Sequence, residues 1–121
     1  MLSKTKTLAI VILLAVVLTA CIPLGPASTP EYSLIGTQGD FNAFVVVDKG
    51  FASDTTALRS IADELCEGHP ICIVLFWDDR NKAATSLPMT DAQVNALVAT
   101  YNRNENTNFT QLLVCTLGDC H

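Results

Sequence analysis

The sequence has 121 residues, of which 50% are hydrophobic and 16% are charged, and its formal net charge at pH 7 is −5. A chain of this length is enough for one domain with a single modest core. Its acidic balance argues against nucleic-acid binding, which requires a basic stripe. It also argues against adsorption to an anionic lipid surface through charge alone.

Residues 1–20 have the pattern of an export signal. Two lysines, Lys4 and Lys6, precede an apolar run from Leu8 to Leu18. A positive segment followed by a short apolar segment is typical of secretory signals. The run is too short to span a bilayer comfortably, since a spanning helix needs about 20 residues. We therefore expect export rather than a permanent transmembrane anchor.

The end of this run, Leu18-Thr19-Ala20-Cys21, resembles the lipobox of bacterial lipoproteins. The resemblance implies that the chain is cut before Cys21 and that Cys21 is lipidated with fatty acids such as palmitate. Two or three acyl chains make a stable membrane anchor. The alternatives are an uncleaved anchor and plain secretory cleavage. Plain cleavage is disfavoured because Leu18 does not suit a cleavage site that requires small residues.

Residues 21–30 then form the lipidated cysteine and a tether, and residues 31–121 form the domain. Pro23, Pro26 and Pro30 predict an extended segment without regular pairing. Loss of residues 1–20 removes two lysines and no acidic residue, which leaves five basic and twelve acidic side chains, a formal charge of −7. The exported domain is therefore more acidic than the whole chain.

The first half of the domain predicts strands on both sides of a helix. Residues 31–36 form an edge strand, and the β-branched run 43–47 forms a second strand that the turn 48–50 ends. A helix begins at Ser53 or Asp54, stops at Gly68 and Pro70, and carries apolar residues at one-face spacing, namely Leu58, Ile61, Ala62 and Leu65. The continuous apolar run 71–77 predicts a central strand that is covered on both faces.

The second half predicts a helix and a last strand. The polar stretch 78–88 has room for a short edge strand. Thr90 and Gln93 form a capping box that begins the second helix. Met89 is expected to pack on Val94, and the buried stripe of this helix consists of Val94, Leu97, Val98 and Tyr101. The asparagine-rich segment 102–108 ends the helix, and residues 111–117 form the last strand.

The order strand-helix-strand-helix-strand predicts a small single-domain α/β fold. Each helix would make a crossover between two strands of the same direction. We therefore expect a mostly parallel sheet of three to four strands, with the run 71–77 at its centre.

Four cysteines besides Cys21 are an even number in an exported chain, which predicts two disulfides. Three pairings of Cys66, Cys72, Cys115 and Cys120 are open. The local pairs Cys66–Cys72 and Cys115–Cys120 are favoured because each falls at the end of an element, where a tight loop can close. A zinc site is the alternative, but the spacings of five and four residues do not match the usual zinc pattern.

Three aspartates follow predicted strands and are candidate ligands for a metal ion. Asp48 ends the first strand of the predicted parallel sheet, and Asp78 and Asp79 end the next. Sites in such sheets form outside the carboxyl ends of the strands, and clustered carboxylates suit Mg²⁺ or Ca²⁺. The alternative is structural, because aspartates at strand ends often bond to their own backbone in turns.

The sequence has no recognisable catalytic set and no glycine-rich phosphate loop, which favours binding over catalysis and implies no cofactor. We expect a membrane-anchored, extracytoplasmic lipoprotein at the cell membrane or the outer membrane. Its partners would be the membrane, through the anchor at Cys21, and an envelope protein or external ligand bound by the domain, with no nucleic acid. The alternative is a metal-assisted hydrolase that uses Asp48, Asp78 and Asp79.

Overall fold

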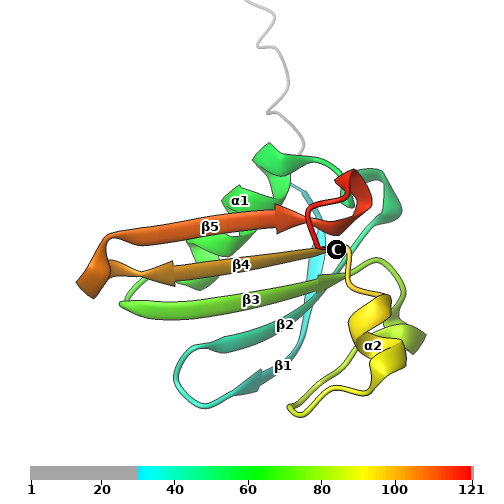
Figure 1. The fold of residues 1–121 in the computed structure, drawn as a ribbon, viewed down its shortest axis with the longest axis horizontal. Coiled ribbons are helices and arrows are strands. Elements are labelled where there is room, and N and C mark those ends of the chain that lie inside the picture. Colours follow the sequence, from blue (N-terminus) through cyan, green and yellow to red (C-terminus); the bar gives the residue numbers. More distant parts are fainter. Residues whose placement is uncertain (1–29, 121) are drawn as a thin grey trace, which may run out of the picture.

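The computed structural model describes residues 30–120, which form a five-stranded sheet with two α-helices (Figure 1). The strands are β1 (Tyr32–Gln38), β2 (Asn42–Val47), β3 (Ile71–Trp77), β4 (Ala99–Asn104) and β5 (Phe109–Val114). The helices are α1 (Thr55–Leu65) and α2 (Asp91–Asn95). Single-turn 3-10 segments are η1 (Lys49–Phe51), η2 (Arg80–Lys82), η3 (Glu105–Thr107) and η4 (Cys115–Leu117).

The predicted edge strand at the start of the domain is present as β1, which pairs with β2 in an antiparallel hairpin. Gly39 turns the chain with a positive φ of 64°, a conformation that glycine adopts without steric cost. The register shifts between Leu34 and Gly36, which marks a bulge. A Cβ at Gly36 would lie 2.6 Å from the carbonyl oxygen of Thr85, so this close approach of two backbones requires glycine.

The predicted strand-helix-strand unit is confirmed as β2, α1 and β3. The Asp54 side chain caps α1 by accepting a hydrogen bond of 3.0 Å from the backbone N–H of Ala57. Residues at one-face spacing, Leu58, Ile61 and Ala62, are buried on the sheet. Beyond the helix, Gly68 has a φ of 78°. β3 lies parallel to β2 and occupies the centre of the sheet, as its continuous apolar run predicts.

The predicted second helix is correct at its start and wrong in its length. Thr90 and Gln93 make both bonds of the capping box, but α2 ends at Asn95 and the chain re-enters the sheet at Ala99. Val94, expected in the core, is 46% exposed, whereas Val98 and Tyr101 are buried. Tyr101 is buried because it belongs to a strand: residues 99–104 alternate between the two faces of the sheet.

The expected mostly parallel sheet is also wrong. Only β2 and β3 run parallel within residues 30–120, and the other three strand pairs are antiparallel. α2 has five residues, about 7.5 Å at 1.5 Å per residue, and does not run the length of a strand as a crossover helix does; β4 returns antiparallel beside β3. The asparagine-rich segment does turn the chain, with Asn108 in the left-handed conformation, but it joins β4 to β5. The polar stretch 78–88 holds η2 rather than a strand.

The two faces of this sheet are covered differently. α1 lies across one face, behind β4 and β5 in Figure 1, and the core beneath it includes Val45, Val74, Phe76 and Tyr101. Among residues 30–120, cover on the opposite face lies at the carboxyl end of β3, where α2 and the segment before it pack on Phe44, Leu75 and Trp77. The Trp77 indole N–H donates to the carbonyl oxygen of Gln93 at 2.9 Å, which fastens α2 to this end.

Candidate binding surface

The three candidate metal ligands follow strands, as expected, and the side chains of two of them, Asp48 and Asp79, are engaged in turns. The Asp48 side chain accepts from the N–H of Gly50 at 2.9 Å and begins η1. Asp79 accepts from the N–H of Asn81 at 2.9 Å and begins η2. Within residues 30–120, no three His, Cys, Asp or Glu side chains are grouped so that they could hold a metal ion. The geometry of Asp48 and Asp79 therefore matches the structural interpretation, and Asp78 joins no such group.

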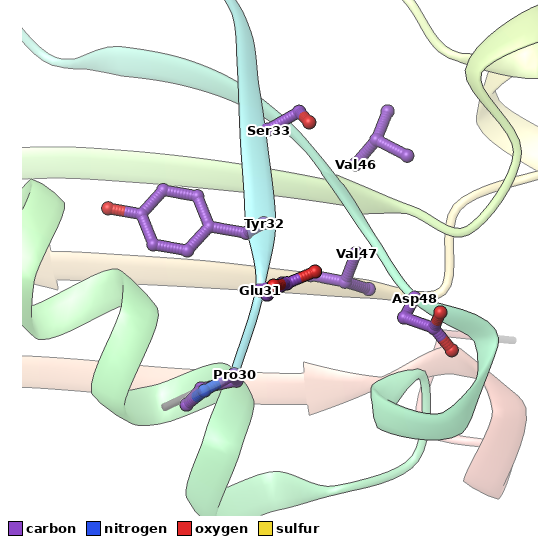
Figure 2. Close-up of a pocket in the computed structure, with 7 residues that line it drawn as sticks. All are labelled: Pro30, Glu31, Tyr32, Ser33, Val46, Val47 and Asp48. Carbon is purple, nitrogen blue, oxygen red and sulfur yellow. The ribbon is translucent and has the colours of Figure 1, made fainter. Parts of the chain in front are cut away.

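A hollow of about 630 Å³ lies where the chain enters the domain (Figure 2). The ends of β1 and β2 line it, with Glu31 and Asp48 among its residues. Figure 2 shows the Tyr32 ring pointing away from Asp48, toward α1. Burial, followed by the charge of Glu64 and a hydrogen bond with it, raises the pKa of Tyr32 above 10.0. The hollow is open, and two carboxylates alone do not make a metal site.

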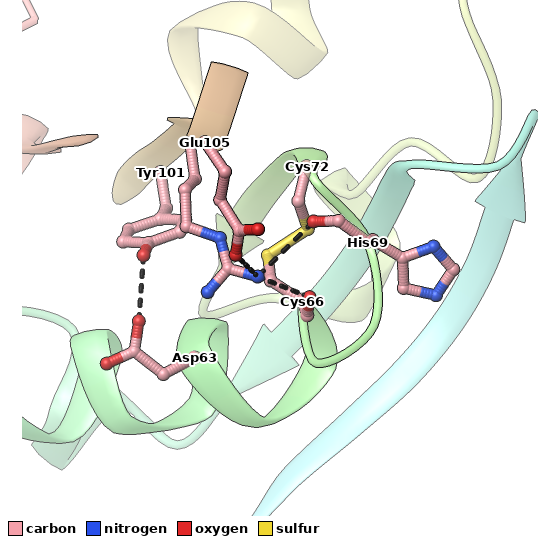
Figure 3. The surroundings of a disulfide bond; sticks show 7 residues. Asp63, Cys66, His69, Cys72, Tyr101 and Glu105 are labelled. Carbon is pink, nitrogen blue, oxygen red and sulfur yellow. Dashed lines mark hydrogen bonds and ion pairs between the residues drawn. A yellow bond between two sulfur atoms is a disulfide. The ribbon is translucent and has the colours of Figure 1, made fainter. Parts of the chain in front are cut away.

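The first predicted disulfide, Cys66–Cys72, joins the end of α1 to the start of β3, with 5.6 Å between the Cα atoms (Figure 3). The Arg103 guanidinium lies beside it and donates to the carbonyl oxygens of Cys66 and His69. Glu105 forms an ion pair with Arg103 at 3.4 Å. These contacts hold the loop between helix and strand, so their role is structural.

Tyr101 supplies a second polar contact under α1. Its hydroxyl donates to Asp63 Oδ1 at 2.7 Å (Figure 3). Burial raises the pKa of Tyr101 above 10.0, and the hydrogen bond and the negative charge of Asp63 raise it further. The phenol therefore stays protonated at neutral pH and acts as a hydrogen-bond donor that ties β4 to α1.

The second predicted disulfide, Cys115–Cys120, closes a loop directly after β5, with 4.6 Å between the Cα atoms. The loop contains η4 and a left-handed Gly118. The loop brings Asp119 back beside Val114, the last residue of β5. Asp119 accepts from the Val114 N–H at 3.1 Å through its carboxylate, and its own N–H donates to the Val114 carbonyl oxygen at 3.2 Å.

An uncovered area remains on the face opposite α1, across β3, β4 and β5, and we call it the open face. The strand register places its side chains in two rows. One row consists of Ile73, Asn102 and Gln111, and the next of Ile71, Asn104 and Phe109. Ile71 is 40% exposed and Phe109 is 48% exposed. The open face therefore carries amide and apolar side chains and no charged group.

The open face continues toward α2 through a hollow of about 260 Å³. Leu97, Thr100 and Leu113 line this hollow, together with the exposed Val94. It connects the two rows to the covered end of the sheet. Amides can donate and accept hydrogen bonds, and the apolar side chains offer contact area beside them, so the whole surface suits an uncharged ligand or protein surface.

The sequence interpretation did not find this surface, because it placed residues 97–101 in a helix. A usable signal was present. Residues 99–104 read Ala-Thr-Tyr-Asn-Arg-Asn, and an alternation of this kind favours a strand with two different faces. Reading it as a strand would have brought Asn102 and Asn104 to the same face.

Cys21 and the residues that resemble a lipobox lie outside the described residues. Among residues 30–120, no helix is long and apolar enough to cross a membrane. Comparison of the chain with models of protein families, with curated proteins and with solved structures gave no match.

Proposed function

We propose that this protein is a lipid-anchored, extracytoplasmic binding domain and that its partner contacts the open face. The sequence Leu18-Thr19-Ala20-Cys21 supports the anchor. Two disulfides within the folded domain support an oxidising compartment. The observation that carries the binding role is the open face itself, where amide and apolar side chains of β3, β4 and β5 reach solvent opposite the face that packs on α1.

The chemistry of the open face restricts the partner. It has no charged side chain in either row, although the domain as a whole is acidic. Recognition through it would depend on shape, amide hydrogen bonds and apolar contact. We therefore expect binding that changes little with salt, in contrast to binding through a charged patch.

Mass spectrometry of the native protein tests the anchor. We expect a mature chain that begins at Cys21 and carries fatty acids on that residue. A product with its initiator methionine, or a mature chain without lipid, would contradict the proposed anchor and leave the open face to be tested separately.

Capture from envelope extracts tests the binding surface. Asn102→Arg places a charge in the middle of the open face, and Ser60→Arg places the same charge on the exposed side of α1 as a matched control. We expect saturable capture of the same partner by the wild-type chain and by Ser60→Arg, and at least tenfold weaker capture by Asn102→Arg. Equal loss in both variants, or in neither, would reject the open face as the binding surface.

A further inference from the structure

The two edges of the sheet are protected to different degrees. At β1, the bulge interrupts the edge, Gly36 packs against the backbone of Thr85, and Gln38 accepts a hydrogen bond from the Leu87 N–H. At β5, the backbone of the outer side bonds, within the described part of the chain, only to the loop closed by Cys115–Cys120, through Asp119 at Val114. An open strand edge is a template for pairing with another strand.

The register identifies which backbone groups of β5 point outward. The Cys115 N–H donates inward, to the Val98 carbonyl oxygen at 2.8 Å. Because the direction alternates along an antiparallel strand, Val114, Leu112 and Thr110 direct their N–H and C=O groups away from β4. Asp119 bonds both groups of Val114. The described residues supply no partner for the outward groups of Leu112 and Thr110.

We propose that β5 pairs antiparallel with β5 of a second copy of this chain, with Gln111 on the two-fold axis. In this register Thr110 of each copy exchanges two hydrogen bonds with Leu112 of the other. Moving the axis to Leu112 would place Thr110 opposite Val114, whose groups Asp119 already occupies. Moving it to Thr110 would place Leu112 opposite the left-handed turn residue Asn108. The Gln111 register is therefore the one that uses all the open groups.

The side chains of β5 fit this register. Phe109 of one copy lies opposite Leu113 of the other on the open face, which makes two apolar cross-strand pairs. The two Gln111 side chains face each other at the axis. The strand Phe-Thr-Gln-Leu-Leu-Val has no charged residue in a chain whose net charge is −5, so two acidic copies meet here without like charges in contact.

The association is weak and depends on concentration, because one strand pair is small compared with a stable protein interface. Pairing joins the sheets of the two copies and makes their open faces continuous. Asp119 marks the end of the interface in each copy, which limits pairing to residues 109–113 and closes the assembly as a two-fold dimer.

A disulfide cross-link between full-length chains in detergent tests the register. Gln111→Cys places two sulfurs opposite each other at the axis, where the Cα atoms of a non-hydrogen-bonded pair are about 4.5 Å apart. Thr37→Cys, at an exposed position on β1, is the matched control. We expect a covalent dimer on non-reducing gels for Gln111→Cys at least tenfold more abundant than for Thr37→Cys. Equal cross-linking of both variants would overturn the proposal.

Charged substitutions at the two-fold axis provide an independent test, in which analytical ultracentrifugation measures association of the same detergent-solubilised chains. Gln111→Glu and Gln111→Lys each place like charges opposite one another, and we expect each to raise the dimer dissociation constant about fivefold. An equimolar mixture pairs opposite charges and should recover the dimer. Unchanged association of the single variants, or no recovery in the mixture, would show that Gln111 does not lie at a two-fold axis.

Discussion

The face of the sheet beneath α1 and the face beside α2 are built from the same strands, yet the buried cluster beneath α1 is much larger. Beneath α1, alternate residues of β2, β3, β4 and β5 join one buried cluster with the apolar side of the helix. On the other face, burial is confined to the end of the sheet around Phe44 and Trp77. Because each strand contributes alternate residues to each face, the same strands can bury one set of side chains beneath α1 and leave the other set in contact with solvent.

Substitutions of two β3 residues that lie on opposite faces test most directly how much each face contributes to stability. Phe76 is fully buried beneath α1, whereas Ile73 lies on the open face. Phe76→Ala should lower the free energy of unfolding by about 3–5 kcal/mol because it leaves a cavity. Ile73→Ala should cost less, about 1–2 kcal/mol, since this side chain is only partly buried beside the cluster of Phe44 and Trp77. Denaturant titration of both variants measures the difference, and similar losses would mean that the two faces contribute equally.

The two disulfides also differ in burial. Both close short loops, for which restriction of the unfolded chain contributes about 2–3 kcal/mol. Cys66 and Cys72 are also buried in the core beneath α1, so replacing this pair with alanines should cost more than replacing Cys115 and Cys120. Thermal unfolding of the two double variants provides the measurement. A larger loss from the second pair would assign the C-terminal loop a greater role in stability than its exposure indicates.

Tyr101, beneath α1, makes the stability of the fold depend on pH in the alkaline range. Its folded pKa is raised by burial and by Asp63, so the protonated phenol stabilises the fold fully below pH 10, and this contribution is lost as the pH rises through the folded pKa. Tyr101→Phe should cost about 1 kcal/mol at neutral pH through the lost hydrogen bond and should flatten the alkaline decline. Unfolding measured from pH 8 to 11 tests this, because an unchanged slope would place the alkaline response elsewhere.

The smallest predicted effect concerns α2, which borders the open face. Thr90→Ala removes the capping bond to the Gln93 N–H and should cost about 1 kcal/mol or less. Thr90→Ser keeps a hydroxyl and serves as the control. Hydrogen exchange should increase in α2 and stay unchanged in α1 for the alanine variant. Faster exchange in both helices would show that the two faces unfold as one unit.

The local sequence predicted the elements that have both a regular pattern of apolar residues and a residue that marks where the element begins or ends. β2, α1 and β3 follow from the β-branched run, from the Asp54 cap and from the continuous apolar run. The cysteine pairs follow from their short spacing. In each case the interactions that decide the structure lie within a few residues, so the chain itself contains the necessary information.

Strand β4 is an element that the local sequence did not predict correctly. The apolar residues between Val94 and Tyr101 fit a helical spacing, but the edge of β3 required another strand, and pairing with β3 and β5 outweighed the local preference. Because β4 was predicted as a helix, the predicted strand directions were wrong and the open face was not predicted, since the amides of Asn102 and Asn104 share a face only in a strand. The lipidation of Cys21 stays a prediction.

Strand order along the sheet is the same as strand order along the chain. Each newly formed strand can therefore dock on the one made just before it, across two longer connections, residues 48–70 with α1 and residues 78–98 with α2. Such neighbour-by-neighbour growth keeps loop-closure entropy low and favours rapid folding. Because a chain is synthesised from its amino terminus, the strands of this sheet can form in the same order, and the edge strand β5 is completed last.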